Sequence, residues 1–202
     1  WREPSRLVCV IGAGSGGLTV AAGASQMGAS VVLIEKDKMG GDCLNYGCVP
    51  SKAMLAAGHA ADGVRNAGRF GVRAAQPDID SAAVYGHIDG VIAAIEPNDS
   101  VERFEGMGVK VIKGKACFTG PRTVDVDGTR ITARRFVVAT GSGAFVPPIP
   151  GLKEVDFHTN EPIFSVTTLP DHLIVIGGGP IGIELAQAHR HLGCRVTVLE
   201  MF

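Results

Sequence analysis

The stretch LVCVIGAGSGG (residues 7–17) decides the fold of this chain. Its apolar first half predicts a short buried strand that ends in a glycine turn. Helical sequence follows from Gly17 to about Met27, and SVVLI (residues 30–34) predicts a second strand, which Glu35 closes. Strand, glycine turn, helix and strand in this order make a βαβ unit. We therefore expect an α/β protein with a parallel, Rossmann-like sheet.

The glycines of this turn have the spacing G-x-G-x-x-G and are Gly12, Gly14 and Gly17. The first allows a tight turn, the second lets the backbone approach a pyrophosphate, and the third lets the helix pack closely on the strand. The helix start then offers N–H donors to phosphate, and Glu35 can accept ribose hydroxyls. In this context the motif predicts a dinucleotide site.

The same pattern returns near the end of the chain. Residues 172–176 predict a strand, and Glu200 closes the strand predicted at 195–199. The glycines of the second motif are Gly177, Gly179 and Gly182. Glu200 follows its motif at the same distance along the chain as Glu35 follows the first. Two dinucleotide sites predict an enzyme that moves a hydride from one cofactor to another.

The sequence between the two motifs mixes helix and strand signals. A glycine-rich loop at 40–47 precedes a helix from about Pro50, because proline is favoured at the first helical position. Residues 80–106 predict a long helical segment that is interrupted near Pro97. Short β-runs, separated by Gly, Pro and Asp-Gly turn signals, fill residues 109–138.

A proline-rich connector at residues 144–151 is the candidate domain boundary. We expect a first domain over 1–150 and only the beginning of a second over 151–202, because one βαβ unit cannot bury both faces of its sheet. The chain also starts with Trp1 rather than Met. It is therefore expected to be part of a longer protein.

Composition and charge are those of an ordinary globular protein. Hydrophobic residues make up 46% and charged residues 19%, and a net charge of −1 gives no electrostatic case for nucleic acid or anionic membrane. No apolar run approaches the roughly 20 residues of a membrane span, and the N-terminal sequence does not resemble a signal peptide. Five cysteines without a secretion signal favour a reducing compartment. We therefore expect a cytoplasmic protein.

Two of these cysteines, Cys43 and Cys48, lie close together in the sequence. A zinc site would need two more ligands at comparable spacing, and none are found, so no metal site is expected. A redox pair has a physical basis, because a helix start favours the thiolate of Cys48 and Lys52 adds a cation one turn on. Two unrelated thiols in a loop are the alternative. The other cysteines are expected to be packing residues and are Cys9, Cys117 and Cys194.

The segment GGDCLNYGCVPSK (residues 40–52) resembles the active-site segment of the flavoprotein disulfide reductases. It is most similar to their dihydrolipoamide dehydrogenase and mercuric reductase branch. The order of motifs, including Ala-Thr-Gly at 139–141, agrees with that family over the whole chain. The resemblance implies an FAD-binding domain at 1–150 and the truncated start of an NAD(P)H-binding domain at 151–202. It also implies that the C-terminal dimerisation domain is absent from this chain.

The resemblance further implies a role for each motif. Cys48 would face the flavin, Cys43 would exchange with the substrate, and Lys52 would lie beside the flavin and pair with Glu184. The residues implied to bind FAD are Gly12, Gly14, Gly17, Glu35, Lys36, Gly41, Asp42, Lys52, Ala116, Thr140 and Gly141. Those implied to bind the nicotinamide dinucleotide are Gly177, Gly179, Gly182 and Glu200. NAD(H) is expected rather than NADP(H), because the Glu200 carboxylate would repel a 2′-phosphate.

The function implied is that of a homodimeric flavoenzyme of cell redox homeostasis. Electrons would pass from NAD(P)H through FAD to a Cys43–Cys48 disulfide, and then to a small-molecule disulfide or thiol-reactive acceptor. The alternatives are a mercuric or other metal-ion reductase and, for this chain alone, a nucleotide-binding module without turnover. Three features depart from the family. Asp42 stands where relatives often have Thr, Pro180 stands where glutathione reductase has an aromatic gate, and the family's His-Glu acid–base pair is not within the chain. The chain alone is therefore expected not to turn over.

Overall fold

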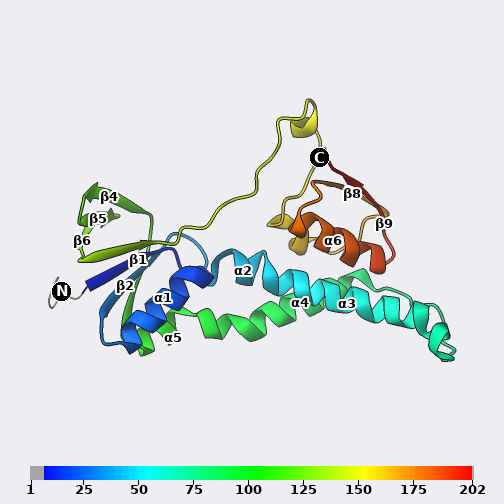
Figure 1. Ribbon diagram of the computed structural model, residues 1–202, viewed down its shortest axis with the longest axis horizontal. Coiled ribbons are helices and arrows are strands. Elements are labelled where there is room, and N and C mark those ends of the chain that lie inside the picture. The colour runs from blue at the N-terminus through cyan, green and yellow to red at the C-terminus, as the bar shows by residue number, and fades with distance from the viewer. Residues whose placement is uncertain (1–6, 202) are drawn as a thin grey trace. The chain divides into compact units, whose positions relative to one another are not determined.

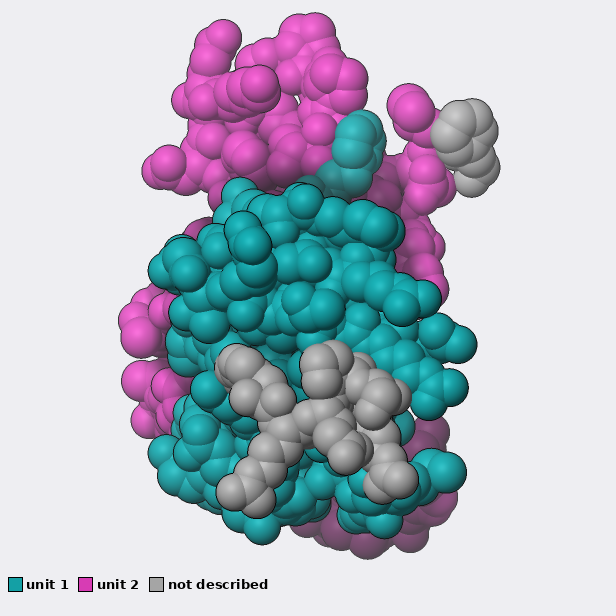
Figure 2. Space-filling model, turned by 90° about the vertical axis from the view of Figure 1, so that its left-hand side faces the viewer, with its two compact units in different colours: residues 1–45, 93–145 teal, residues 46–92, 146–202 magenta. Residues whose placement is uncertain are grey.

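The computed structural model describes residues 7–201, and residues 1–6 and 202 lie outside the described part. The chain forms two compact units, which Figure 2 shows in different colours. Unit 1 comprises residues 1–45 and 93–145, and unit 2 comprises residues 46–92 and 146–202. Each unit is thus assembled from two separate stretches of the chain.

Unit 1 is built around a four-stranded parallel sheet (Figure 1). Its strands, in the order β3-β2-β1-β7, are β3 (Val109–Lys113), β2 (Ser30–Glu35), β1 (Leu7–Ile11) and β7 (Arg135–Val138). Helix α1 (Ser15–Gln26) connects β1 to β2 and begins two residues earlier than expected. The predicted βαβ unit and the parallel α/β fold are confirmed.

Both faces of this sheet are covered, which explains why its central strands β1 and β2 are mainly apolar. Successive residues of β1 point to opposite faces. On one face Val10 packs in a cluster with Leu18 of α1 and Phe104 of α5 (Val101–Gly106). On the other face Cys9 and Ile11 pack against residues of a second, smaller sheet.

That smaller sheet is an antiparallel meander of β4 (Ala116–Gly120), β5 (Thr123–Val126) and β6 (Thr129–Thr132). Its second hairpin turns at Asp127 and Gly128, whose φ angles are +49° and +85°. Positive φ at both central residues is typical of a type I′ turn, whose twist matches that of the strands. The β-runs predicted over 109–138 are therefore present but divided. The outer two join the parallel sheet, and the inner three form the meander.

The long helical segment predicted over 80–106 is confirmed, with its break at the proline. Helix α4 covers Ser81–Ile95, a 3-10 turn covers Glu96–Asp99, and α5 follows Ser100. Proline has no N–H to continue the helix. The Ser100 hydroxyl then accepts the N–H of Arg103 at 3.2 Å and caps the new helix.

Unit 2 contains the second βαβ unit together with two longer helices. Strands β8 (His172–Ile176) and β9 (Arg195–Leu199) pair in parallel, and α6 (Pro180–His191) connects them, as the sequence predicted. Helix α3 (Cys48–Asn66) and most of α4 complete the unit. Its core includes Met54 of α3, Ile88 of α4 and Leu192 after α6, together with Phe164 in a 3-10 turn. No helix in the described part of the chain is both long enough and apolar enough to cross a membrane.

Candidate functional site

The first glycine turn lies between β1 and α1 in unit 1 and has no room for a side chain at Gly12 or Gly17. Gly12 has a φ of +103°, and a Cβ placed there would lie 2.1 Å from the carbonyl oxygen of Ala139. A Cβ on Gly17 would lie 1.8 Å from the carbonyl oxygen of Gly12. Neither contact is possible for real atoms, so both positions require glycine.

The loop at 40–41 packs directly against this turn. Gly40 donates its N–H to the carbonyl oxygen of Ala13 at 2.9 Å, and a Cβ on Gly41 would lie 2.6 Å from the Cα of Gly14. Gly14 is also the N-cap residue of α1, whose first N–H groups have no partner within the helix. A backbone-lined cradle at a helix start fits the diphosphate of a dinucleotide such as FAD.

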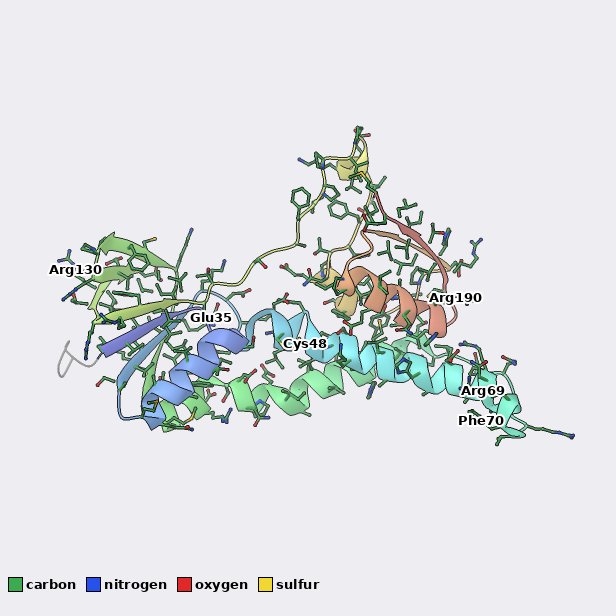
Figure 3. All side chains as sticks on the ribbon, in the orientation of Figure 1. Glu35, Cys48, Arg69, Phe70, Arg130 and Arg190 are labelled. Atoms are coloured by element: carbon green, nitrogen blue, oxygen red, sulfur yellow. The ribbon has the colours of Figure 1, made fainter. Side chains whose placement is uncertain are left out.

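The acid at the end of β2 is tied to this turn. Glu35 is only 7% exposed, and its carboxylate accepts the N–H of Ala13 at 2.6 Å and that of Asp37 at 2.7 Å. Figure 3 labels Glu35 at this end of the sheet. Lys36 follows it and is exposed. The carboxylate is therefore held in a fixed position beside the phosphate cradle, where a ribose would lie.

The second glycine turn, in unit 2, has a similar arrangement. Gly177 has a φ of +109°. A Cβ on Gly182 would lie 2.2 Å from the carbonyl oxygen of Gly177. The Glu200 carboxylate accepts the N–H of Gly178 and, at 2.7 Å, that of Met201. Gly179 is the N-cap residue of α6, and Pro180 occupies the first helical position. Two unrelated stretches of sequence thus form the same kind of site.

The remaining residues expected at the first site lie on unit 1. Ala116 begins β4, and Thr140 and Gly141 follow β7. The Cα of Thr140 would lie 3.2 Å from a Cβ on Gly12, so its backbone borders the glycine turn. Asp42 lies in the first turn of the short helix α2 (Gly41–Asn45).

The two candidate redox cysteines lie on successive helices. Cys43 is half-buried in α2, where a glycine-rich loop was expected, and Cys48 is the exposed first residue of α3. The expected start of α3 near Pro50 is two residues too late, because Gly47 is the N-cap residue. Cys48 thus lies at the positive end of the dipole of α3. Figure 3 labels Cys48 at this helix start.

The other cysteines differ in their surroundings. Burial raises the pKa of the Cys9 thiol to about 11 and also raises the pKa of Cys194, so both are poor nucleophiles. The expectation that Cys117 is a packing residue is wrong. It is exposed, because it lies on β4, an edge strand of the meander.

Within unit 2, Lys52 and Glu184 form an ion pair between their Nζ and Oε1 atoms. The resemblance implied this pair, and the structure contains it. The hydrogen bond to Glu184 raises the pKa of Lys52. Desolvation opposes this effect, and the charges of Glu184 and Cys48 add to it. Lys52 therefore stays an ammonium ion near neutral pH, one helical turn from Cys48.

Sequence reasoning missed Ser51. It is 6% exposed, and its hydroxyl lies 3.2 Å from the Oε2 atom of Glu184. No local pattern could have revealed this contact, because the partner lies on α6, far along the chain. The only signal was a serine directly before Lys52.

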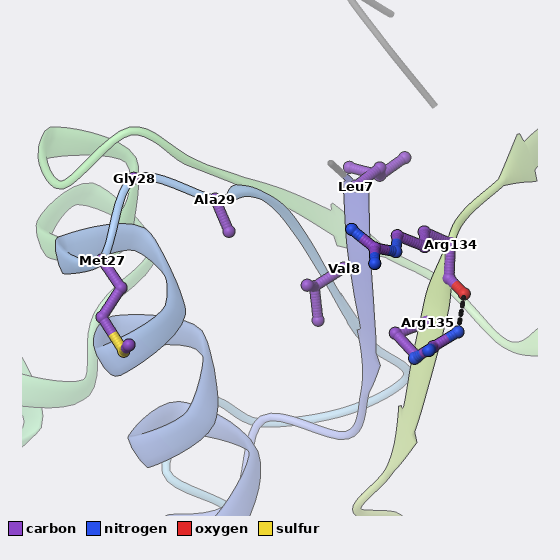
Figure 4. Close-up of a pocket in the computed structure, with 7 residues that line it drawn as sticks. All are labelled: Leu7, Val8, Met27, Gly28, Ala29, Arg134 and Arg135. Atoms are coloured by element: carbon purple, nitrogen blue, oxygen red, sulfur yellow. Dashed lines mark hydrogen bonds between the residues drawn. The ribbon is translucent and has the colours of Figure 1, made fainter. Parts of the chain in front are cut away.

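A separate cavity of about 360 Å³ lies in unit 1 (Figure 4). The residues that line it are Leu7, Val8, Met27, Gly28, Ala29, Arg134 and Arg135. Leu7 and Val8 lie at the amino end of β1, whereas the glycine turn follows its carboxyl end. Ligands of open α/β sheets bind at the carboxyl ends of strands, so this cavity is not part of the nucleotide site.

Comparison with known proteins finds consistent similarities. A family model described as pyridine nucleotide-disulphide oxidoreductase matches residues 6–202. Mercuric reductase of Bacillus cereus is 36% identical over 191 residues, which cover 95% of this chain and 30% of that protein. Dihydrolipoyl dehydrogenase of Acholeplasma laidlawii is 34% identical over 199 residues, which cover 96% of this chain and 59% of that protein.

Among solved structures, the HOCl-induced flavoprotein disulfide reductase RclA of Escherichia coli is similar with a TM-score of 0.82 and 27% identity. The match covers 96% of this chain and 42% of that protein. In each of these comparisons the chain spans less than two thirds of the length of its relative.

Proposed function

Since the chain belongs to the pyridine nucleotide-disulphide oxidoreductase family, we propose that it forms part of an FAD-dependent enzyme that reduces a disulfide between Cys43 and Cys48. Electrons would come from NAD(P)H and leave to a disulfide or thiol-reactive acceptor. The observation that carries this proposal is the Lys52–Glu184 ion pair, one helical turn from an exposed cysteine at a helix start. That arrangement supplies a positive charge where thiolate chemistry needs one.

The two glycine turns are the proposed cofactor sites. The first would hold the FAD diphosphate on the backbone at Gly12, Gly14 and Gly17, with Glu35 on the adenosine ribose. The remaining proposed FAD contacts are Lys36, Gly41, Asp42, Lys52, Ala116, Thr140 and Gly141. The nicotinamide dinucleotide would bind at Gly177, Gly179, Gly182 and Glu200. The fit rests on glycine turns in which Gly12, Gly17 and Gly182 have no room for a Cβ, and on acids held beside them.

Bound FAD would supply an electron carrier that accepts a hydride and releases an electron pair. The residues of this chain would do the rest. Two electrons and two protons convert the disulfide into two thiols, and Cys48 lies at the positive end of the α3 dipole, one helical turn from the ammonium of Lys52. Cys43 would be the thiol that exchanges with the acceptor. The Glu184 carboxylate holds Lys52 in its place on this helix.

Several finer features belong to the same proposal. Glu200 favours NAD(H) over NADP(H). The whole protein would be a cytoplasmic homodimer, with an FAD domain at 1–150 and the start of the nicotinamide domain at 151–202. A mercuric or other metal-ion reductase is a second candidate, because mercuric reductases of Bacillus cereus and Staphylococcus aureus are 36% and 35% identical to this chain.

The experiment that tests this function begins with the purified chain and added FAD. Retention of flavin absorbance after gel filtration, and its loss in Gly17→Ala, would support the first site. In the full-length protein, NADH oxidation should require an acceptor and should be lost in Cys43→Ser and Cys48→Ser. Cys117→Ser, at an exposed cysteine on the meander, is the matched control and should be unaffected. Undiminished activity in both Cys43→Ser and Cys48→Ser would contradict the redox assignment. Lipoamide and Hg²⁺ as alternative acceptors separate the two candidate branches.

A further inference from the structure

Helices α3 and α6 lie side by side in unit 2 along one face of α3. Positions 51, 58 and 65 of α3 recur every two turns and therefore lie on that face. At the first, the Ser51 hydroxyl bonds to Glu184 at 3.2 Å. At the second, a Cβ on Gly58 would lie 3.2 Å from the carbonyl oxygen of Ala188. At the third, Arg65 donates to the carbonyl oxygen of His191. The position of Glu184 is thus set by close packing of the two helices.

Glu184 and its two hydrogen-bond partners, Lys52 and Ser51, differ sharply in burial. The side chain of Lys52 is 67% exposed and that of Glu184 is 27% exposed, whereas Ser51 is 6% exposed. An exposed ion pair between two long side chains holds its geometry poorly, because both lose rotamer freedom to form it. A buried serine has one short, restricted side chain and needs a hydrogen-bond partner. Ser51 is therefore the better-fixed partner of the carboxylate.

The contacts divide the Glu184 carboxylate between two donors. Lys52 bonds to its Oε1 atom, and Ser51 lies within bonding distance of its Oε2 atom. The Ser51 hydroxyl also lies 3.4 Å from the carbonyl oxygen of Cys48, but it has a single proton to donate. The shorter distance and the negative charge of the carboxylate favour Glu184.

We propose that Ser51 is a positioning residue, whose hydroxyl anchors one oxygen of Glu184 so that the other oxygen holds the Lys52 ammonium in place near Cys48. Only the relevance of this anchoring to redox chemistry rests on the proposed function. The anchoring itself is a property of unit 2 and can be measured without any cofactor.

The test measures how accessible the Lys52 amine is to a chemical label. The purified chain, without FAD, is treated with limiting acetic anhydride at a series of pH values, and mass spectrometry compares acetylation of Lys52 with that of exposed Lys153. Ser51→Ala should raise the relative labelling of Lys52 about two- to fivefold, which corresponds to about 0.4–1 kcal/mol, in the lower part of the range for one typical hydrogen bond. Ser51→Thr, which keeps the hydroxyl, should return labelling to the wild-type rate.

Two further variants make the result specific. Ser25→Ala is the matched control, because Ser25 also donates a hydroxyl proton, at 2.6 Å to the carbonyl oxygen of Met107, but on unit 1. It should leave Lys52 labelling unchanged. Glu184→Gln should raise labelling, and adding Ser51→Ala to it should have no further effect. If Ser51→Ala loses its helical circular dichroism, Ser51→Cys replaces it, because a thiol is a weak donor of similar size.

Wild-type labelling in Ser51→Ala would overturn the proposal. So would failure of Ser51→Thr to restore labelling, or an undiminished effect of Ser51→Ala in the Glu184→Gln background. A full-length protein that neither binds FAD nor turns over would refute the proposed function and leave this measurement intact. The two proposals can therefore fail separately.

Discussion

Gly17→Ala and Gly16→Ala are a pair of identical changes at adjacent positions with very different surroundings. Both residues lie in the first turn of α1. A Cβ on Gly17 would lie 1.8 Å from the carbonyl oxygen of Gly12 and 3.4 Å from a methyl group of Val10. A Cβ on Gly16 would meet nothing within 4 Å among the described residues. The pair therefore separates the steric requirement from the general effect of replacing glycine in a helix.

The expected effects have opposite signs. Alanine at position 16 should be neutral or stabilise the fold by up to about 1 kcal/mol, the helix-propensity difference between Gly and Ala. Alanine at position 17 must push backbone against backbone, and no flexible side chain can move aside. We expect it to lower the free energy of unfolding by about 3 kcal/mol, at the upper end of overpacking costs. For a chain of this size that corresponds to a fall in Tm of about 6–12 °C.

Thermal and urea unfolding, followed by circular dichroism on the purified chain, would measure both changes. FAD binding, followed by the quenching of flavin fluorescence, should be lost in Gly17→Ala and kept in Gly16→Ala. Equal stability and equal FAD affinity of the two variants would refute the argument from packing. It would mean that α1 can withdraw from β1 at no cost.

Three further predictions follow from the structure and the proposal. Oxidation of the chain should join Cys43 to Cys48, which requires their Cα atoms to approach within about 7 Å; peptide mapping after oxidation that finds either thiol bonded elsewhere would contradict it. The full-length enzyme should have a higher kcat/KM for NADH than for NADPH, and Glu200→Ala should narrow the difference, because it removes the charge that opposes a 2′-phosphate. Stability should also fall in acid because of His189, whose pKa is lowered from 6.5 by burial, with only a partial opposing effect of its hydrogen bond to Leu185. As the pH drops below about 6.5, His189 is protonated in the unfolded state before it is protonated in the folded state, so the urea concentration at the unfolding midpoint should fall. In His189→Gln that midpoint should fall less between about pH 7.5 and pH 5.5.

The strands and glycine turns could be predicted from the sequence because their signals are local. An apolar run ending in glycine gave the bounds of β1 and β8 directly, and the break at Pro97 followed from proline chemistry. The start of α3 was placed two residues late, because Pro50 is a strong helix-start signal and Gly47 a weak one. Helix α2 was missed because the glycines at positions 40, 41 and 47 predicted a loop. Gly40 and Gly41 do have the positive φ angles typical of a loop, yet the helix begins at Gly41.

Contacts between distant parts of the chain had no such signal. The pairing of Lys52 with Glu184 came from family resemblance and not from any periodicity in the sequence. The bond from Ser51 to the same carboxylate was not anticipated, because only the packing of α6 against Gly58 brings those residues together. The separate roles of the β-runs also depend on tertiary structure. Nothing in the residues of β7 distinguishes a strand of the parallel sheet from a further strand of the meander.

If the glycine turns bind nucleotides as proposed, the bonds between each acid and its turn make nucleotide affinity depend on folding. A carboxylate has about four acceptor positions, and backbone N–H groups already take one on each oxygen of Glu35 and of Glu200. These bonds hold each carboxylate in a fixed orientation. A freely rotating glutamate would lose about 0.5–1.5 kcal/mol of rotamer entropy on capturing a ribose. Here that cost falls on the folding of the chain instead. Variants that loosen either turn should therefore weaken nucleotide binding even when every contacting atom is unchanged.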